Sequence, residues 1–508
     1  MHEANFDERA YLILNPDVAA AVRTGTITSG RAHWEQCGHR EGRLTSLPPS
    51  RPEFDEAEYL QWNPDVAYAI RGGAFASGYE HWVARGQYEG RHGGPARVSI
   101  TREARLARAR HNPFGVNYYG FHSAVSGLGS ATRGYVEALR SRLIRQLDVD
   151  IPRWGAHFPT DEEIVHTDLR YRINFIHQNA DMMPHFVKKY GRQVFEGAYN
   201  IGIWVWELNC AHPEWHRAST YLDEIWAPTV FCRDALAGVS AVPVLRMPYV
   251  VPAMDNLARH GREHFGIPRD AFVFLYIFDV SSYIERKNPA TLVLAFRRAF
   301  GNSSKALLVL KYINGGTSPL AIECLRKIAA DSHVRFIDAD FSEEELASLH
   351  LQADCFVSPH RAEGFGFNIA QALYFGKPVI ATGYSGNMDF TTDRSAFLID
   401  YTLSRIPFTM GPYSEHMAWA EPSVAHLEAL LRTVMENREI GRRKGEEGAK
   451  IVRREYSLAA VSSRIERRFA DLCFSGRRAR RSLRAVGAAI YRMSPGIVAR
   501  AARIINAA

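Results

Sequence analysis

Residues 355–371 read Cys-Phe-Val-Ser-Pro-His-Arg-Ala-Glu-Gly-Phe-Gly-Phe-Asn-Ile-Ala-Gln, which joins a short apolar run to a glycine-containing turn and a helical stretch. The apolar run predicts a buried strand, and a helix is expected to begin near Phe367. Glu363, Gly364 and Gly366 stand between the two, where an open α/β sheet binds its ligands. The glycines let a ligand approach the backbone, and the helix N-terminus attracts an anion. We therefore expect an α/β sheet with a ligand site here, although the same residues could serve only to cap the helix and shape its turn.

The same texture continues on both sides of this stretch. Short apolar runs alternate with amphipathic helical stretches, which is typical of parallel α/β sheets. Strands are expected in two series, near 114–118, 173–177, 200–206, 224–228 and 244–248, and then near 272–279, 306–312, 334–338, 355–358, 378–381 and 396–399. The series predict two Rossmann-like doubly wound lobes facing a cleft, at 114–251 and 252–473. The hinge is expected near Val250-Val-Pro252, and helices over about 423–473 close the second lobe.

The residues before these lobes form a tandem pattern. Residues 6–43 recur as residues 54–91 with an offset of 48, through shared Asn-Pro-Asp and His-Trp elements. Proline after asparagine predicts the first turn of a helix, and the glycine after His-Trp predicts the end of a second one. Region 1–95 is therefore expected to hold two small helical repeats that pack together, with a linker over 96–113.

Composition and charge narrow the class of protein. The formal net charge is +7, and residues 474–508 alone hold eight arginines and no Asp or Glu. The rest of the chain is therefore near neutral, which argues against a body that binds nucleic acid. The basic tail could bind an anionic inner membrane face or could simply be solvated.

Cysteine spacing and hydropathy predict a cytoplasmic protein. The six cysteines form no Cys-x-x-Cys pair, so neither a disulfide framework nor a zinc site is indicated. No apolar run is long enough to span a bilayer, and the acidic start does not resemble a signal peptide. Attachment to the inner face of the membrane through the tail is compatible with this prediction.

Two further loops are expected at the same edge of the second sheet. The strand ending at Thr382 leads into Gly383-Tyr-Ser-Gly-Asn387, and the strand ending at Asp279 leads toward Arg286 and Lys287. Two cations before a helix suit a diphosphate, although an adjacent pair of this kind is often only a solvated surface feature. The convergence of three such loops favours a nucleotide site.

These motifs, in this order, resemble the retaining glycosyltransferases of family 4, which have the GT-B fold; the resemblance covers about residues 114–470. In that family two glutamates eight residues apart face the donor, the first at the transferred sugar and the second at the ribose. The first corresponds to Glu363, but the second falls on Gln371, which keeps hydrogen-bonding capacity and lacks charge. Asp389 falls where the family often carries an acidic residue.

The family's basic pair on the diphosphate corresponds to a position near Ser281 and to Lys287. Because serine is not basic, Arg286, Arg361 or Lys311 is expected to supply the missing charge. The donor-binding residues that the resemblance implies are Gly127, Gly129, Arg286, Lys287, Lys311, Arg361, Glu363, Gly364, Phe365, Gly366, Gln371, Ser385, Gly386 and Asn387.

The first lobe is expected to supply the acceptor side. The glycine loop at Gly127 and Gly129 follows the first strand, and the resemblance places it over the donor phosphates. His177 and Asn179 end one strand, and Glu207 follows the next. Glu207 stands where many relatives carry a histidine that touches the reacting sugar, so it is expected to accept a hydrogen bond from a hydroxyl of the donor or the acceptor. The alternative is a structural carboxylate that binds a backbone amide. The catalytic residues we predict are Glu363, Glu207 and Lys287.

The resemblance implies a retaining glycosyltransferase that moves a sugar from a nucleotide-sugar donor to a glycan or lipid-linked saccharide, in bacterial surface polysaccharide assembly. The leaving phosphate would help to take the acceptor proton, so catalysis would rest on positioning and charge stabilisation. No Asp-x-Asp motif stands at a suitable strand end, so neither a metal nor another cofactor is expected. A non-catalytic nucleotide-sugar-binding or scaffolding protein, which Gln371 favours, and a nucleotide-sugar epimerase are the alternatives.

Overall fold

A computed structural model describes residues 6–41, 43, 45, 54, 56, 59, 60, 63–86, 109, 111–124, 126–151, 170–255 and 259–474. The chain divides into two compact units, Met1–Ile100 and Thr101–Ala508. Most of the predicted linker and nearly all of the predicted basic tail lie outside the described residues.

The N-terminal unit is helical. Its described elements are α1 (Glu8–Leu14), α2 (Pro16–Arg23), α3 (Gly30–His33), η1 (Trp34–Gly38), α5 (Pro64–Arg71), α6 (Gly78–His81) and η2 (Trp82–Gly86). As expected, α2 and α5 begin at the proline and η1 and η2 end at the glycine, whereas α1 was not predicted. In both segments a tyrosine hydroxyl meets a buried histidine Nδ1 at 2.9 Å, Tyr11 with His33 and Tyr59 with His81.

The first lobe of the second unit is built on a parallel sheet with the strand order β2-β1-β3-β4-β5-β6. The strands are β1 (Val116–Gly120), β2 (Gln146–Asp150), β3 (Ile173–Ile176), β4 (Tyr199–Ile203), β5 (Glu224–Ala227) and β6 (Val244–Arg246). The helices are α8 (Gly127–Arg140), η3 (Ala180–Met182), α9 (Met183–Tyr190), η4 (Arg192–Phe195), α10 (Trp215–Ser219) and α11 (Val230–Ala237). Every strand except β2 was predicted.

The second lobe has a parallel sheet with the order β12-β11-β10-β7-β8-β9. The strands are β7 (Phe272–Asp279), β8 (Ala306–Ile313), β9 (Val334–Asp338), β10 (Cys355–Ser358), β11 (Val379–Thr382) and β12 (Phe397–Ile399). The helices are η5 (Arg262–Phe265), η6 (Val280–Ser282), α12 (Ile284–Lys287), α13 (Pro289–Phe300), η7 (Gly315–Thr317), α14 (Pro319–Ile328), α15 (Glu343–Gln352), α16 (Phe367–Tyr374), η8 (Gly386–Asp389), α17 (Val424–Glu436) and α18 (Arg438–Glu455).

Strand order locates the ligand edge of this sheet. From β7 the chain runs to β8 and β9 on one side, whereas β10, β11 and β12 follow on the other side. The order therefore reverses between β7 and β10, and the crevice at such a reversal is where doubly wound sheets bind ligands. The loops after β7 and β10 carry the cations and the carboxylate predicted from sequence.

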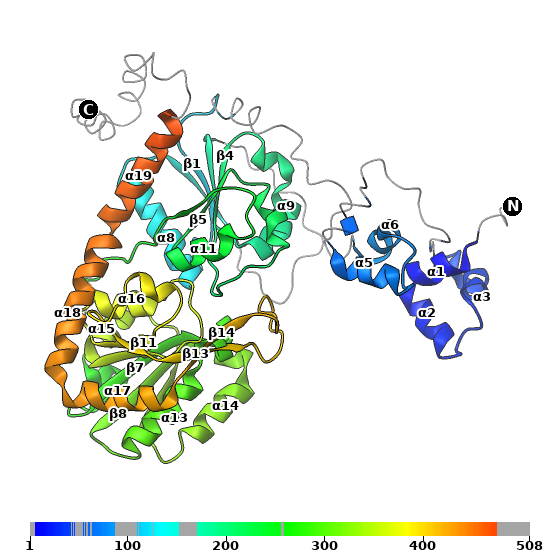
Figure 1. Cartoon of the computed structure of the whole chain (residues 1–508). Helices are drawn as coiled ribbons and strands as arrows, with labels where there is room; N and C mark the ends of the chain where they lie inside the picture. The colour runs from blue at the N-terminus through cyan, green and yellow to red at the C-terminus, as the bar shows by residue number, and fades with distance from the viewer. Residues whose placement is uncertain are drawn as a thin grey trace. The chain divides into compact units, whose positions relative to one another are not determined.

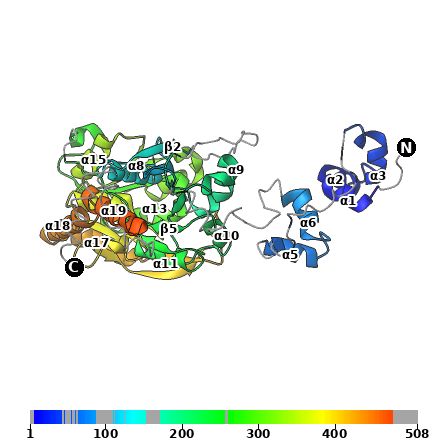
Figure 2. The same ribbon diagram turned by 90° about the horizontal axis from the view of Figure 1, so that it is seen from above.

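Two features connect the lobes (Figure 1). The last described helix, α19 (Leu458–Phe474), leaves α18 and packs on α8 of the first lobe (Figure 2). Arg468 on α19 binds the fully buried carboxylate of Glu224 on β5, and Nε of Arg468 lies 3.1 Å from Oε2 of Glu224. A hairpin of β13 (Tyr401–Arg405) and β14 (Ala418–Pro422), which sequence did not predict, extends from the second lobe. None of the helices in the described part of the chain has the length and apolar character needed to cross a bilayer.

Candidate functional site

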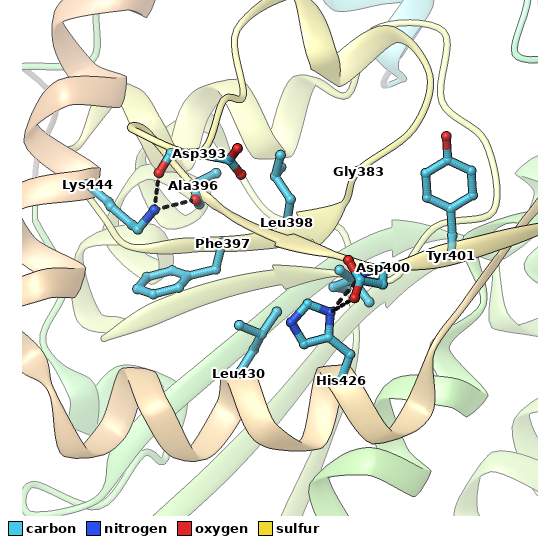
Figure 3. Close-up of a pocket in the computed structure, with 11 residues that line it drawn as sticks. Gly383, Asp393, Ala396, Phe397, Leu398, Asp400, Tyr401, His426, Leu430 and Lys444 are labelled. Atoms are coloured by element: carbon cyan, nitrogen blue, oxygen red, sulfur yellow. Dashed lines mark hydrogen bonds and ion pairs between the residues drawn. The ribbon is translucent and has the colours of Figure 1, made fainter.

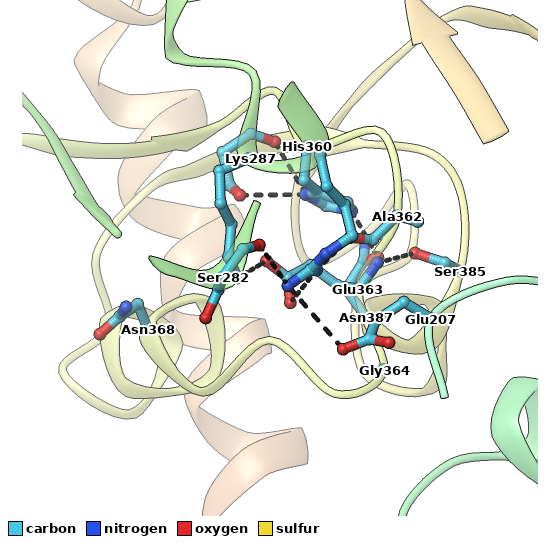
Figure 4. Close-up of polar contacts among 12 residues, drawn as sticks. Glu207, Ser282, Lys287, His360, Ala362, Glu363, Gly364, Asn368, Ser385 and Asn387 are labelled. Carbon is cyan, nitrogen blue, oxygen red and sulfur yellow. Dashed lines mark hydrogen bonds and ion pairs between the residues drawn. The ribbon is translucent and has the colours of Figure 1, made fainter. Parts of the chain in front are cut away.

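A carboxylate and two cations meet at the reversal between β7 and β10 (Figure 4). Lys287 ends α12, and its Nζ donates to Oε1 of Glu363 on the loop between β10 and α16. The Nη1 atom of Arg286 lies 3.4 Å from the other oxygen, Oε2. The three predicted residues are thus brought together as one ion-paired cluster.

The cluster keeps its carboxylate ionised. Burial alone would raise the pKa of Glu363, but Lys287 and Arg286 outweigh it and lower that pKa to about 2. Burial lowers the pKa of Lys287, and the ion pair with Glu363 opposes this effect. At neutral pH Glu363 can accept hydrogen bonds and cannot donate one.

Arg286 is held rigidly beneath the carboxylate. Arg286 is 3% exposed. Its Nη1 donates to the carbonyl oxygen of Ala362 at 2.7 Å, and its Nη2 donates to that of Ser282 at 3.2 Å. Its Nε is buried with no hydrogen-bond partner among the described residues. Its positive charge is therefore fixed in place beside Glu363.

The turn after β11 supports the same loop. The Ser385 hydroxyl accepts from the amide of Glu363 at 2.9 Å, and the amide of Gly386 donates to the Glu363 carbonyl at 2.8 Å. A Cβ on Gly386 would overlap the carbonyl of Gly364, so this contact requires glycine. Asn387 is buried and its Oδ1 lies 3.0 Å from Nε2 of His360. These bonds fix Glu363 from the backbone outward.

The helix that follows presents its N-terminus to this cluster. α16 begins at Phe367, after Gly366 at φ 88°, a left-handed conformation that favours glycine. The ring of Phe365 packs on Tyr249, the residue before the predicted hinge at Val250-Val-Pro252, with centroids 5.4 Å apart. A Cβ on Gly127, at the start of α8, would lie 3.8 Å from Phe367. The glycine loop of the first lobe therefore adjoins the N-terminus of α16.

The first lobe contributes Glu207 to the same cluster. Its Oε1 lies 3.8 Å from Nη2 of Arg286, and its Oε2 accepts from the hydroxyl of Tyr413 at 2.9 Å. Tyr413 lies between β13 and β14 and stacks on Trp206, with centroids 5.2 Å apart and ring planes at 9°. Tyr413 was not predicted, because none of the residues around it in the sequence indicates a partner in the other lobe.

The two other residues predicted for the acceptor side, His177 and Asn179, belong to the first lobe. His177 is 1% exposed, and its Nδ1 lies 3.0 Å from the hydroxyl of Tyr118. Burial lowers the pKa of His177 to about 3, so its ring is neutral. The Oδ1 of Asn179 accepts from the amide of Val205 at 2.9 Å and supports the loop that leads to Glu207.

Two cations proposed for the diphosphate are engaged elsewhere. The guanidinium of Arg361 makes two bonds to the carboxylate of Glu421 on β14, at 2.5 and 2.8 Å. The Nζ of Lys311 lies 5.2 Å from the ring centre of Phe341. Their role at the diphosphate stays a prediction, as does that of Gln371, which lies on α16.

Asp389 serves the interface between the lobes. Its carboxylate accepts from Nε of Arg246 at 2.6 Å and from the amide of Val230 at 3.1 Å, both in the first lobe. Gly364 packs closely against the first lobe as well, because a Cβ at this position would overlap Cγ2 of Val205. The lobes are therefore closed on each other around the Glu363 loop.

A cavity of about 560 Å³ opens beside β12 (Figure 3). Lys444 lines it and donates to the carbonyl of Ala396 at 3.0 Å. None of the predicted site residues lines this cavity. We therefore place the candidate site at the ion-paired cluster.

Part of the second lobe matches a known protein family. Residues 261–404 match the sequence model of the family described as Glycosyl transferases group 1. The second lobe therefore carries a domain of that family, and the domain includes Lys287, Glu363 and Ser385. A search of curated proteins gives no match.

Solved structures share the fold at low identity. Sucrose-phosphate synthase (tll1590) from Thermosynechococcus elongatus is 14% identical, and the match covers 72% of this chain and all of that one, with a TM-score of 0.54. A glycosyltransferase from Rickettsia africae ESF-5 is 12% identical over 72% of this chain and all of that one, with a TM-score of 0.53. Alr3699/HepE from Anabaena, solved in complex with UDP and glucose, is 13% identical over 70% of this chain and all of that one, at 0.51. These likenesses confirm the predicted GT-B fold.

Proposed function

We propose that this chain, whose second lobe carries a group 1 glycosyl transferase domain, is a retaining glycosyltransferase. It moves a sugar from a nucleotide-sugar donor to a glycan or lipid-linked saccharide, in bacterial surface polysaccharide assembly. The observation that carries the proposal is the ionised carboxylate of Glu363 beside Lys287 and Arg286, at the reversal between β7 and β10. Two solved neighbours of the fold are consistent with it: Alr3699/HepE, which was solved with UDP and glucose, and a protein named as a glycosyltransferase.

Each group has a role in this proposal. The Glu363 carboxylate accepts hydrogen bonds from hydroxyls of the transferred sugar. Lys287 gives up part of its ion pair with Glu363 and binds the diphosphate. The N-terminus of α16 and the fixed charge of Arg286 add positive potential where the leaving group gains negative charge. The leaving phosphate takes the acceptor proton, so no protein nucleophile is assigned. Because these groups supply the positive charge, the proposal assigns no role to a metal.

A donor screen tests the proposal. Melting temperatures of the full chain are measured with UDP-glucose, GDP-mannose, ADP-glucose and CMP-N-acetylneuraminate, and again for Glu363→Ala. We expect one donor to stabilise the wild type, with a smaller effect on the variant. If none of these four donors raises the melting temperature, wider panels of UDP-, GDP-, ADP- and CMP-sugars are screened. A wild-type chain that no donor stabilises would contradict the proposal.

The same screen separates the alternative functions. Transfer to octyl glycosides, followed by mass spectrometry, indicates a transferase, and conversion of the free donor to its epimer indicates an epimerase. Donor binding without transfer or hydrolysis would favour the non-catalytic binding protein that Gln371 suggests.

The basic tail extends the proposal to the acceptor. The eight arginines of residues 474–508 would hold a cytoplasmic enzyme against anionic lipids, where lipid-linked acceptors reside. Sedimentation with vesicles of phosphatidylcholine and phosphatidylglycerol, compared with phosphatidylcholine alone, tests this. Removal of residues 475–508 should abolish binding to the anionic vesicles, and equal binding without the tail would contradict it.

A further inference from the structure

The β13–β14 hairpin is anchored at its base beside the cations of the site. Glu421 on β14 binds the guanidinium of Arg361, and the amide of Ala420 donates to the Arg361 carbonyl at 3.0 Å. The amide of Arg361 in turn donates to the carbonyl of Arg286 at 2.8 Å. The hairpin is therefore tied by short bonds to the residues next to Glu363.

The loop of the hairpin, residues 406–417, reaches the first lobe. Met410 and Tyr413 pair with each other in a tight turn, and the carbonyl of Pro412 is bonded by Nε2 of His212. Tyr413 is 4% exposed, with its ring against Trp206 and its hydroxyl on Glu207. A side chain of the second lobe thus completes the surroundings of a carboxylate of the first lobe.

We propose that Tyr413 is a positioning residue that aims Glu207 at the acceptor. The hydroxyl of Tyr413 donates a hydrogen bond to Oε2 of Glu207. The other oxygen, Oε1, lies 3.8 Å from Nη2 of Arg286, which is beyond hydrogen-bonding distance. Oε1 is left to accept a hydrogen bond from a hydroxyl of a bound saccharide. This inference rests on the proposed function and adds the residue that orients its acceptor side.

The two partners belong to different lobes, which gives the contact a second consequence. Tyr413 can hold Glu207 only while the lobes are closed, as they are here around Gly364 and Asp389. The acceptor side is therefore completed by the same movement that encloses the donor. Lobe closure and orientation of Glu207 become one event.

The hydroxyl can be tested apart from the ring. Phenylalanine at position 413 keeps the stack on Trp206 and loses only the bond to Glu207. Tyr401→Phe is the matched control, because Tyr401 is on the same hairpin, is 38% exposed and packs on Tyr384 instead. Both changes remove one oxygen atom, so a difference between them reports the contact with Glu207.

The experiment is a double-mutant cycle on donor turnover. Release of nucleotide is measured for wild type, Tyr413→Phe, Glu207→Gln and the double variant, with the best donor of the screen and octyl glycosides as acceptors. We expect Tyr413→Phe to lower kcat about tenfold, the value of a hydrogen bond to a charged group, with donor KM changed less than about twofold. In the Glu207→Gln background the same change should alter kcat less than about twofold.

The outcomes separate this inference from the proposed function. Wild-type turnover in Tyr413→Phe, or a full effect in the Glu207→Gln background, overturns the inference alone. A wild-type chain that neither binds nor turns over any donor overturns the proposed function and the inference with it. If Tyr413→Phe fails to fold, Glu207→Asp replaces it: the shorter carboxylate withdraws from the hydroxyl and should lose about as much, and wild-type kcat in that variant contradicts the proposal.

Discussion

The ammonium of Lys287 donates directly to Glu363 although 76 residues separate them in the chain. Lys287 ends α12, which follows β7, and Glu363 stands on the loop after the adjacent strand β10; the chain departs from these two strands in opposite directions. The pair therefore lies at the reversal of strand order. Its charges are largely buried, so each depends on the other for stability as well as for any role with a ligand.

Replacement of Glu363 by glutamine should destabilise the fold. The change leaves Lys287 and Arg286 without their countercharge, and removal of one partner from a buried pair costs about 3 kcal/mol or more. Urea unfolding of the variant and the wild type measures the free energy of unfolding. The double variant Glu363→Gln, Lys287→Met is the control and should recover part of the loss. An unchanged free energy in the single variant would show that the cluster is solvated.

A buried histidine makes stability depend on pH. His350 on α15 is 1% exposed, and neither ring nitrogen has a hydrogen-bond partner among the described residues. Burial lowers the pKa of His350 from 6.5 to about 3. The unfolded chain therefore takes up a proton below pH 6.5 and the folded chain does not, so stability is fully present above pH 6.5. It is lost toward pH 3, by at most about 1.4 kcal/mol per pH unit for one histidine.

His350→Leu should remove this contribution. We expect the variant to gain about 1 kcal/mol at pH 7, because an unpaired polar group leaves the core, and to lose less stability from pH 6.5 to 4.5. Urea unfolding at several pH values measures both. His426→Leu, at a half-buried position on α17, is the control. An acid limb as steep as that of the wild type would mean that His350 does not set it.

Gly364→Ala should hold the lobes apart. A Cβ at this position overlaps Cγ2 of Val205, and a displacement of about 1 Å in an active site can cost about a hundredfold in rate. We expect donor turnover to fall by that order while each lobe stays folded. Val205→Ala removes the overlapping atom, so the double variant should regain much of the rate. No rescue would place the effect of Gly364→Ala elsewhere.

Gln371→Glu should tighten donor binding. A carboxylate accepts ribose hydroxyls more strongly than an amide does, and a gain of about 1 kcal/mol corresponds to about fivefold in Kd. Calorimetric titration with the best donor of the screen measures it, and Gln371→Ala should weaken binding in the same assay. If neither change alters Kd, the side chain of residue 371 does not contact the nucleotide.

Most of the strands that sequence predicted carry a short apolar run, and the edge strand β9, Val-Arg-Phe-Ile-Asp, is an exception. β7 and β10 are buried along nearly their whole length, as parallel strands covered on both faces should be. β2 was missed because it lies at the edge of its sheet, where Gln146-Leu-Asp-Val-Asp alternates between half-buried and exposed. The β13–β14 hairpin was missed for a similar reason, since β13 is largely exposed.

The core of the candidate site could be predicted from sequence because its residues follow the ends of two strands that are neighbours in the sheet. The meeting of Glu363, Lys287 and Arg286 could be predicted from that placement. Tyr413 could not, because its partner Glu207 lies 206 residues away in the other lobe. The bidentate bond between Arg361 and Glu421 depends on the unpredicted hairpin in the same way. The contacts that could not be predicted are made by segments whose position in the fold is not indicated by any repeating pattern of apolar residues.

The bond between Arg468 and Glu224 also sets an order for folding during synthesis. The carboxylate of Glu224 is fully buried and is bonded by Tyr199 and Trp226, but its only cation among the described residues is on α19. The ribosome delivers that helix after both sheets have been made. The first lobe to emerge is therefore the last to be completed, because a nascent chain stalled before residue 468 still lacks the arginine that pairs with Glu224.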